Sequence, residues 1–299
     1  VKISDGNYSV LVTSGYNSTT DGKGRLWMLS PSSGAVVHEF VTADGSLGSE
    51  AGLAHVSPFV EADGTTRYVY GGDLLGNVWK FDLVGKTTPA KVAVLKDASG
   101  NTQPVTAAPE LLYYASQRIV LIGTGRLLDI SDFGSNRVQT FYAISDGATL
   151  ANARSGLVQQ VYTRSGDTIT SNPVDWATTR GWYMDLPAGE QENTRPALTR
   201  GAIAFVTNMA GSSDCSASSY LYVLNVLNGQ RYMESTYVGT TISPTANSSG
   251  VNALLTSGNP PPPSCPIPPC PPPPPPPPPG PNCSHIVGSG QTADGASWK

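Results

Sequence analysis

The chain has 299 residues, of which only 13% are charged, and its formal net charge is −4. That length is sufficient for one large domain or two small ones. Nucleic-acid binding requires clustered Lys and Arg side chains, which this sequence lacks, so we expect no nucleic-acid partner. No apolar run approaches the roughly 18 residues of a membrane span. A signal peptide is not visible at Val1, and we expect the chain to begin inside a longer precursor.

The composition favours short strands joined by tight turns over helices. Gly is abundant with 32 residues, whereas Met and His number only 4 and 3. A two-strand pattern recurs along the chain, in which a run of β-formers leads to a turn and a second strand carries an aromatic residue. Its copies are 9–15 with 24–29, 67–72 with 76–81, 118–123 with 140–144, and 201–206 with 219–224.

Segment 181–186 resembles the second strand of a partial fifth repeat. Irregular spacings of roughly 40 to 60 residues are typical of propeller blades whose loops carry insertions. Each unit is a small sheet with apolar side chains on both faces, so each face must be buried against a neighbour. We therefore predict an all-β fold of the β-propeller class, with a plain β-sandwich as the alternative. We expect Trp27 and Trp79 to pack between blades.

Most of the 26 prolines lie in residues 259–281, including an unbroken run from Pro271 to Pro279. Such a run has no backbone donors, so it cannot join a sheet and should adopt polyproline II. Strand-like sequence resumes at 285–290. We therefore predict an arm inserted in the last blade and projecting from the propeller. The predicted domains are blades in 1–258, a Pro-rich inserted loop in 259–283 and the final propeller strands in 284–299.

The four cysteines are Cys215, Cys265, Cys270 and Cys283, and three of them lie in or next to the Pro-rich stretch. Zinc is disfavoured because paired C-x-x-C hooks are lacking and the nearby sequence offers only His285. Disulfides are the better interpretation, and they imply export to an oxidising compartment. Cys270 with Cys283, or Cys265 with Cys270, is a possible local pair, and the remaining cysteine of the arm then pairs with Cys215.

Residues 70–83, which read Tyr-Gly-Gly-Asp-Leu-Leu-Gly-Asn-Val-Trp-Lys-Phe-Asp-Leu, closely resemble the signature segment of the C-terminal β-propeller of type IV pilus assembly (PilY-type) proteins. The match covers most of residues 7–258 and the last dozen. Further stretches match in the same order, at 15–17, 103–110, 123–126, 181–187 and 297–299. On this resemblance the scaffold signature residues are Tyr70, Gly72, Asp73, Gly76, Trp79 and Asp82.

The resemblance implies a secreted, non-enzymatic protein that acts in type IV pilus biogenesis and in adhesion at the pilus tip. The implied location is extracellular, at the pilus tip or cell surface, after export through the periplasm. The implied partners are minor pilins or pilus-tip subunits and a host or surface ligand, which bind loops on the propeller scaffold. Because the family domain has blades upstream of Val1, we expect an incomplete ring.

The family often carries a calcium loop of spaced aspartates just before the signature segment. Here only Glu61 and Asp63 remain, and Arg67 occupies the place of the terminal ligand. Calcium requires six to eight oxygen ligands, so we expect a solvated acidic turn, and we predict no metal, cofactor or catalytic residue. The alternatives are a quinoprotein-type dehydrogenase, which needs charged residues converging on an ortho-quinone, and a carbohydrate-binding propeller.

Overall fold

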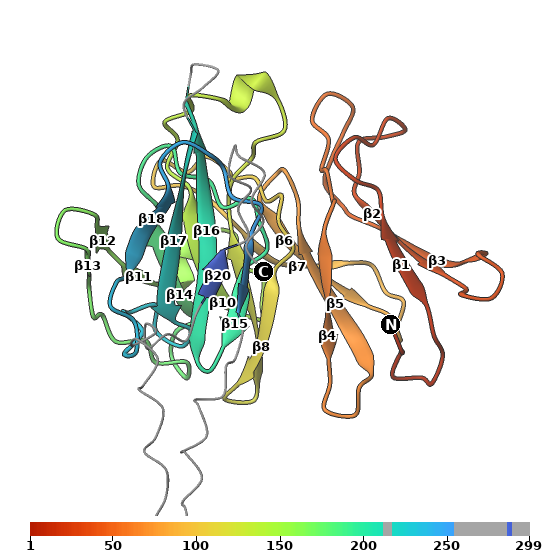
Figure 1. Cartoon of the computed structure of the whole chain (residues 1–299). Coiled ribbons are helices and arrows are strands. Elements are labelled where there is room, and N and C mark those ends of the chain that lie inside the picture. Colours follow the sequence, from red (N-terminus) through yellow and green to blue (C-terminus); the bar gives the residue numbers. More distant parts are fainter. Residues whose placement is uncertain (212–216, 254–285, 289–299) are drawn as a thin grey trace, which may run out of the picture.

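The computed structural model describes residues 1–211 and 217–253, together with the backbone of a strand at 286–288. Four principal sheets lie side by side in an arc, and each sheet is one blade (Figure 1). Blade one contains β1 (Val10–Thr13), β2 (Arg25–Leu29) and β3 (Val36–Val41). Blade two contains β4 (Val56–Val60), β5 (Thr66–Gly72), β6 (Asn77–Asp82) and β7 (Ala90–Val94).

Blades three and four continue the arc with the same antiparallel order. Blade three contains β8 (Glu110–Tyr114), β9 (Gln117–Gly123), β10 (Thr140–Ser145), β14 (Gly181–Asp185) and, parallel to β14, β11 (Val158–Gln160). Blade four contains β15 (Ala197–Thr199), β16 (Ala202–Ala210), β17 (Ala217–Asn225) and β18 (Gly239–Ser243).

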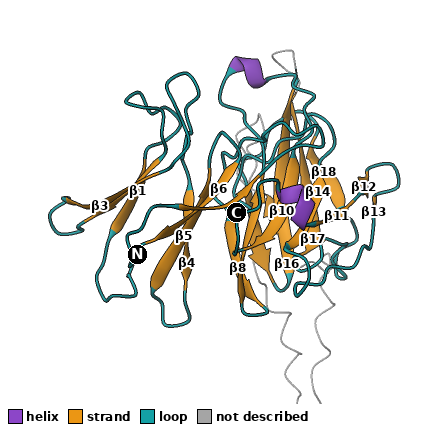
Figure 2. Cartoon of the chain, turned by 180° about the vertical axis from the view of Figure 1, so that it is seen from behind, coloured by secondary structure: helices purple, strands orange, loops and turns teal. Residues whose placement is uncertain are grey.

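The smaller elements lie outside these four sheets. Two 3-10 helices occupy connecting loops (purple in Figure 2). They are η1 (Ile130–Asp132) and η2 (Ala153–Gly156). Two further strand pairs are antiparallel, namely β12 (Tyr162–Thr163) with β13 (Thr168–Ile169), and β19 (Val251–Ala253) with β20 (Ile286–Gly288). No helix in the described part of the chain is long and apolar enough to cross a membrane.

Four apolar layers hold the sheets together. Three lie between successive blades, and the fourth lies between blade four and β19. The side chains of a strand alternate between its two faces, so one strand supplies both of its neighbouring layers. In β10, for example, Phe141 and Ala143 enter the layer with blade four, whereas Tyr142 and Ile144 enter the layer with blade two. Phe141 stacks on Phe205 of β16 with ring centroids 4.0 Å apart. The fold is therefore an all-β propeller built by face-to-face packing of blades.

Within the described residues the ring is open, as expected. The outer layers join blade one to blade two, and blade four to β19. On blade one, the face opposite this layer exposes Val10 and Val12, which are 47% and 41% exposed. Trp27 is half-buried on that face, with its indole nitrogen 3.1 Å from Glu39 Oε1. Trp27 contacts no other blade within the described residues, and the expectation that it packs between blades stays a prediction.

The interpretation of residues 181–186 as part of a fifth repeat is wrong. Strand β14 pairs with β10, placing Tyr183 opposite Tyr142, so it is the fourth strand of blade three. Residues 146–180, which contain η2, β11 and the β12–β13 hairpin, separate the two paired strands. A connection this long between neighbouring strands produced a sequence spacing that looked like a blade of its own.

Candidate functional site

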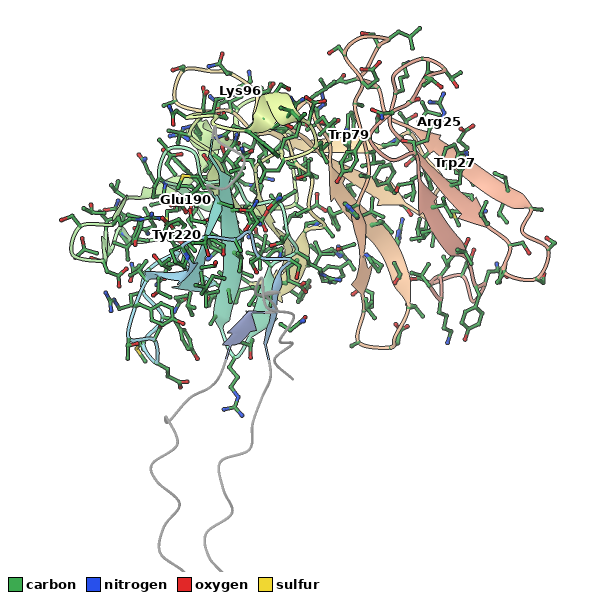
Figure 3. All side chains as sticks on the ribbon, turned by 45° about the horizontal axis from the view of Figure 1, so that its top comes forward. Arg25, Trp27, Trp79, Lys96, Glu190 and Tyr220 are labelled. Atoms are coloured by element: carbon green, nitrogen blue, oxygen red, sulfur yellow. The ribbon has the colours of Figure 1, made fainter. Side chains whose placement is uncertain are left out.

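Asp73 is the centre of the predicted signature, and it is fully buried. Its carboxylate accepts hydrogen bonds from the backbone amides of Leu75 and Asn77, both at 2.9 Å. The Asn77 side-chain amide donates at 2.9 Å and the Trp79 indole at 2.7 Å. Trp79 itself is 1% exposed in the layer between blades one and two (Figure 3). Asp73 and Asn77 therefore close the β5–β6 turn, and Asp73 fixes the side chain of Trp79 in the core.

The remaining signature residues lie in the core, in the β5–β6 turn and in an ion pair within blade two. Tyr70 is buried and donates to Asp146 of blade three at 2.8 Å. A Cβ on Gly72 would lie 2.4 Å from a Val105 methyl, so only glycine permits this approach. Gly76 has a φ of +81° in the β5–β6 turn. Asp82 binds Arg67 at 3.0 Å. Tyr70 and Gly72 thus contact elements outside blade two, whereas Gly76 and Asp82 act within it, and the scaffold role of the set stays a prediction.

Glu61 and Asp63 of the acidic turn have separate partners. Glu61 binds Arg118 at 2.7 Å, and Asp63 accepts from the Thr65 hydroxyl at 2.7 Å. Arg67 forms its ion pair with Asp82. The absence of calcium here stays a prediction. All four cysteines and the Pro-rich segment 259–283 lie outside the described residues, so the disulfide and domain-boundary predictions also stay predictions.

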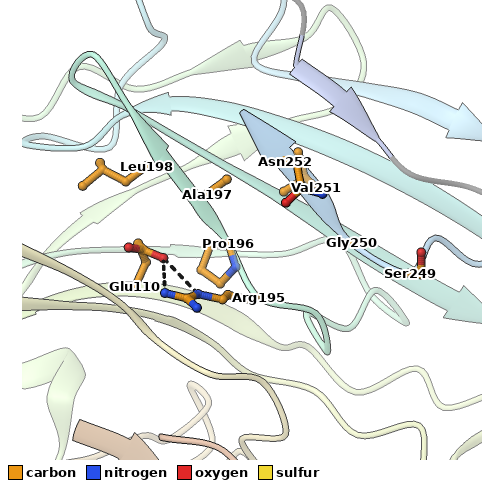
Figure 4. Close-up of a pocket in the computed structure, with 9 residues that line it drawn as sticks. All are labelled: Glu110, Arg195, Pro196, Ala197, Leu198, Ser249, Gly250, Val251 and Asn252. Atoms are coloured by element: carbon orange, nitrogen blue, oxygen red, sulfur yellow. Dashed lines mark hydrogen bonds and ion pairs between the residues drawn. The ribbon is translucent and has the colours of Figure 1, made fainter. Parts of the chain in front are cut away.

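A cavity of about 390 Å³ lies where the first strands of neighbouring blades meet (Figure 4). Strands β8 and β15 are the first strands of blades three and four, and β19 follows blade four. The lining residues are Glu110, Arg195, Pro196, Ala197, Leu198, Ser249, Gly250, Val251 and Asn252. The volume lies within the usual range of small-ligand pockets.

The charged groups of this cavity form one ion pair. Arg195 binds Glu110 at 3.1 Å, and the Arg195 side chain remains 60% exposed. Asn252 adds a side-chain amide. Adjacent donors and acceptors of this kind suit a polar ligand that both donates and accepts hydrogen bonds. The cavity is consequently a candidate site for polar contact at the inner side of the arc.

Sequence reasoning missed the pairing of Arg195 with Glu110, because 85 positions separate the two residues. A weak signal was present. Pro58, Pro109 and Pro196 lie in or directly before the first strands of blades two, three and four. Proline is tolerated at strand starts and sheet edges, so this recurrence marks the strands that line the inner side of the arc.

A second polar cluster is buried where blades three and four meet. Glu190, which is 1% exposed, accepts hydrogen bonds from the hydroxyls of Thr207 at 2.5 Å and Tyr222 at 2.8 Å. Arg164 binds the other oxygen of Glu190 and lies 3.7 Å above the Tyr220 ring (Figure 3). Burial raises the pKa of Glu190, and the hydroxyl and guanidinium donors partly offset that effect. The cluster is saturated by its own members and is a structural contact.

Comparison with known proteins settles the family. The model of the PilY1 beta-propeller domain matches residues 1–172, which is more than half of the chain. The chain belongs to the PilY1 propeller family. A "Type IV pilus biogenesis factor PilY1 homolog" from Xylella fastidiosa (strain Temecula1) is 30% identical over 269 residues, covering 77% of this chain and 18% of that relative.

Further PilY1 proteins agree with this assignment. PilY1 from Pseudomonas aeruginosa strain PAO1 is 28% identical over 241 residues, covering 62% of this chain and 20% of the relative. The chain thus spans about a fifth of the length of these curated relatives. The crystal structure of the Pseudomonas aeruginosa PilY1 C-terminal domain shares the fold, with a TM-score of 0.70 and 21% identity, covering 86% of this chain and 67% of that one.

Proposed function

We propose that this PilY1-family propeller acts in type IV pilus biogenesis and tip adhesion as a non-enzymatic scaffold whose loops bind its partners. Family membership supports the proposal, since the curated relatives carry the name of type IV pilus biogenesis factors. The observation that carries it is the burial of Asp73 and Trp79, which bond to each other within the core. Asp73 and Trp79 therefore serve the packing of the scaffold, which leaves the loops for partner contact.

The proposed partners are minor pilins or other pilus-tip subunits, together with a host or surface ligand. The proposed location is extracellular, at the pilus tip or cell surface, following export through the periplasm. The inner cavity with Glu110 and Arg195 and the loops between strands are the surfaces available for such contacts. The names of the relatives link the family to the pilus, and the role of this chain follows by analogy.

Capture of the tagged full-length protein from piliated cells tests the proposal. We expect minor pilins to be enriched relative to an untagged strain, and we expect fewer surface pili when the gene is deleted. Capture without pilus subunits, combined with normal piliation in the deletion strain, would overturn the proposed role.

A ligand titration tests the non-enzymatic part separately. Purified protein is mixed with pyrroloquinoline quinone and calcium, and bound quinone is quantified by absorbance after gel filtration. We expect no stoichiometric binding and no quinone-dependent dye reduction with alcohols. Binding of one quinone per chain, accompanied by dye reduction, would favour a dehydrogenase instead.

A further inference from the structure

The loop that connects β17 to β18 presents two tyrosines and a methionine, beside the exposed Glu234, at one end of blade four. Tyr232 and Tyr237 are half-buried and pack against the apolar layer that blade four shares with β19. Met233 lies between them in sequence and is 92% exposed. The Tyr232 hydroxyl donates to the Arg200 carbonyl at 2.9 Å, which places the loop beside the β15–β16 turn. We call Tyr232, Met233 and Tyr237 the tyrosine shelf.

The tyrosine shelf is held in place by polar contacts on its other side. Arg231 donates to the Thr236 carbonyl at 2.9 Å and to the Asp167 carbonyl at 2.6 Å. The Asp167 carboxylate accepts from the backbone amides of Val238 and Gly239, both at 2.9 Å. A surface that is fixed before binding loses less conformational entropy when a partner docks. The exposure of Met233 is therefore a property of an ordered loop.

Residues 248–253, which lead into β19, run toward the tyrosine shelf. Ser248 is bonded to Asn208, near the Ala210 end of β16, at 2.7 and 2.9 Å. Residues 249–252 then line the same cavity as residues 195–198, and β19 contacts both β15 and β16. Strand β19 therefore runs alongside β15 and in the same direction. Strand β15 ends at Thr199, opposite Ala202 and next to the Arg200 turn. Strand β19 consequently points toward the end of blade four that carries the shelf.

The chain leaves the described structure after Ala253 and rejoins it at Ile286. Ala253 of β19 is paired with Ile286 of β20, so the intervening chain leaves and returns at one point. Pro260 is only a few residues beyond Ala253 and, at about 3.5 Å per residue, lies within roughly 25 Å of it along the chain. Residues 254–285 contain no Asp, Glu, Lys or Arg, so the prolines offer contact through their rings and not ion pairs.

We propose that the tyrosine shelf is the docking surface for the Pro-rich segment 259–283 of the same chain. Proline-rich chains in polyproline II pack their rings on aromatic side chains, and their stiffness lowers the entropic cost of binding. Tyr232 and Tyr237 supply ring surface, and Met233 supplies an adaptable apolar contact. The segment then lies against blade four instead of projecting freely from it.

Methionine oxidation measures the docking directly. The protein is treated with dilute hydrogen peroxide, and conversion of Met233 to the sulfoxide is followed by peptide mass spectrometry. The comparison variant replaces Pro271–Pro279 with a Gly/Ser sequence of equal length. We expect Met233 to be oxidised several-fold more slowly in the unaltered chain. Met209, half-buried near the opposite end of β16, is the internal reference and should react equally in both proteins.

Equal Met233 rates in the two proteins would overturn the proposal. Protection that disappears on dilution would also overturn it, since docking within one chain is independent of concentration. Two further variants test the surface, with melting temperature as a check of folding. Tyr232→Ser should speed Met233 oxidation in the unaltered chain, whereas Tyr232→Phe keeps the ring and should retain protection. Equal protection in both variants would show that the Tyr232 ring is not part of the docking surface.

Discussion

Asp73 and Asp97 make almost the same set of hydrogen bonds in different surroundings. Each carboxylate accepts from the backbone amides two and four residues later, and from the side chain of the Asn at the fourth position. Asp73 is fully buried and also accepts from Trp79, whereas Asp97 lies in an exposed turn. Comparing the two residues separates the contribution of burial to the free energy of unfolding from the contribution of the turn geometry.

We expect Asp73→Ala to lower the free energy of unfolding by about 3 kcal/mol, because it leaves the Asn77 amide and the Trp79 indole buried without an acceptor. Asp97→Ala should cost about 1 kcal/mol or less, since its donors reach water. Urea unfolding followed by tryptophan fluorescence measures both changes. Similar costs for the two variants would show that the turn, and not the buried network, carries the energy.

At the scale of one element, the hairpin of β8 and β9 has an unusual turn. Tyr114 pairs with Gln117, so Ala115 and Ser116 form a two-residue loop, and both have positive φ angles of 49° and 61°. Such turns normally contain Asn-Gly, because other residues are strained in this region. The double variant Ala115→Asn, Ser116→Gly should stabilise the protein by about 1 kcal/mol in thermal unfolding. Ala98→Asn, at an exposed position with an ordinary φ, is the control and should have little effect.

The elements differ in how well the sequence predicted them. Strands β2, β6, β10 and β17 were all predicted, because each is a run of β-formers with an aromatic residue. The inner strands β4, β8 and β15 were missed. Pro58, Pro109 and Pro196 in or directly before them suggest loops. The cavity could not be predicted either, because Glu110 and Arg195 meet only after blades three and four have packed together.

At the scale of the whole molecule, Glu192 links stability to pH. Its side chain is fully buried between blades three and four, against Gly123, and neither carboxyl oxygen makes a well-formed hydrogen bond within the described residues. Burial raises its pKa well above the ordinary value, and the Gly123 amide offsets this only in part. The folded protein therefore binds a proton at Glu192 that the unfolded chain releases above its own lower pKa.

Because the folded-state pKa of Glu192 is the higher one, this stabilising effect is complete below the unfolded pKa. It is lost as the pH rises through the folded value. Glu192→Gln keeps the size but cannot ionise, so its unfolding midpoint in urea should fall less as the pH rises above the ordinary pKa of glutamate. The exposed Glu234→Gln variant should retain the parent slope. Parallel pH profiles for the parent and Glu192→Gln would contradict this assignment.

The open arrangement of the described blades also bears on how residues 1–253 would transmit mechanical load. In a closed ring, tension between two points is shared by two routes around the circle. Here a pull applied to blade one reaches β19 through each apolar layer in turn. The layers bear the force in series, so the weakest interface between sheets sets the force that the described arc withstands.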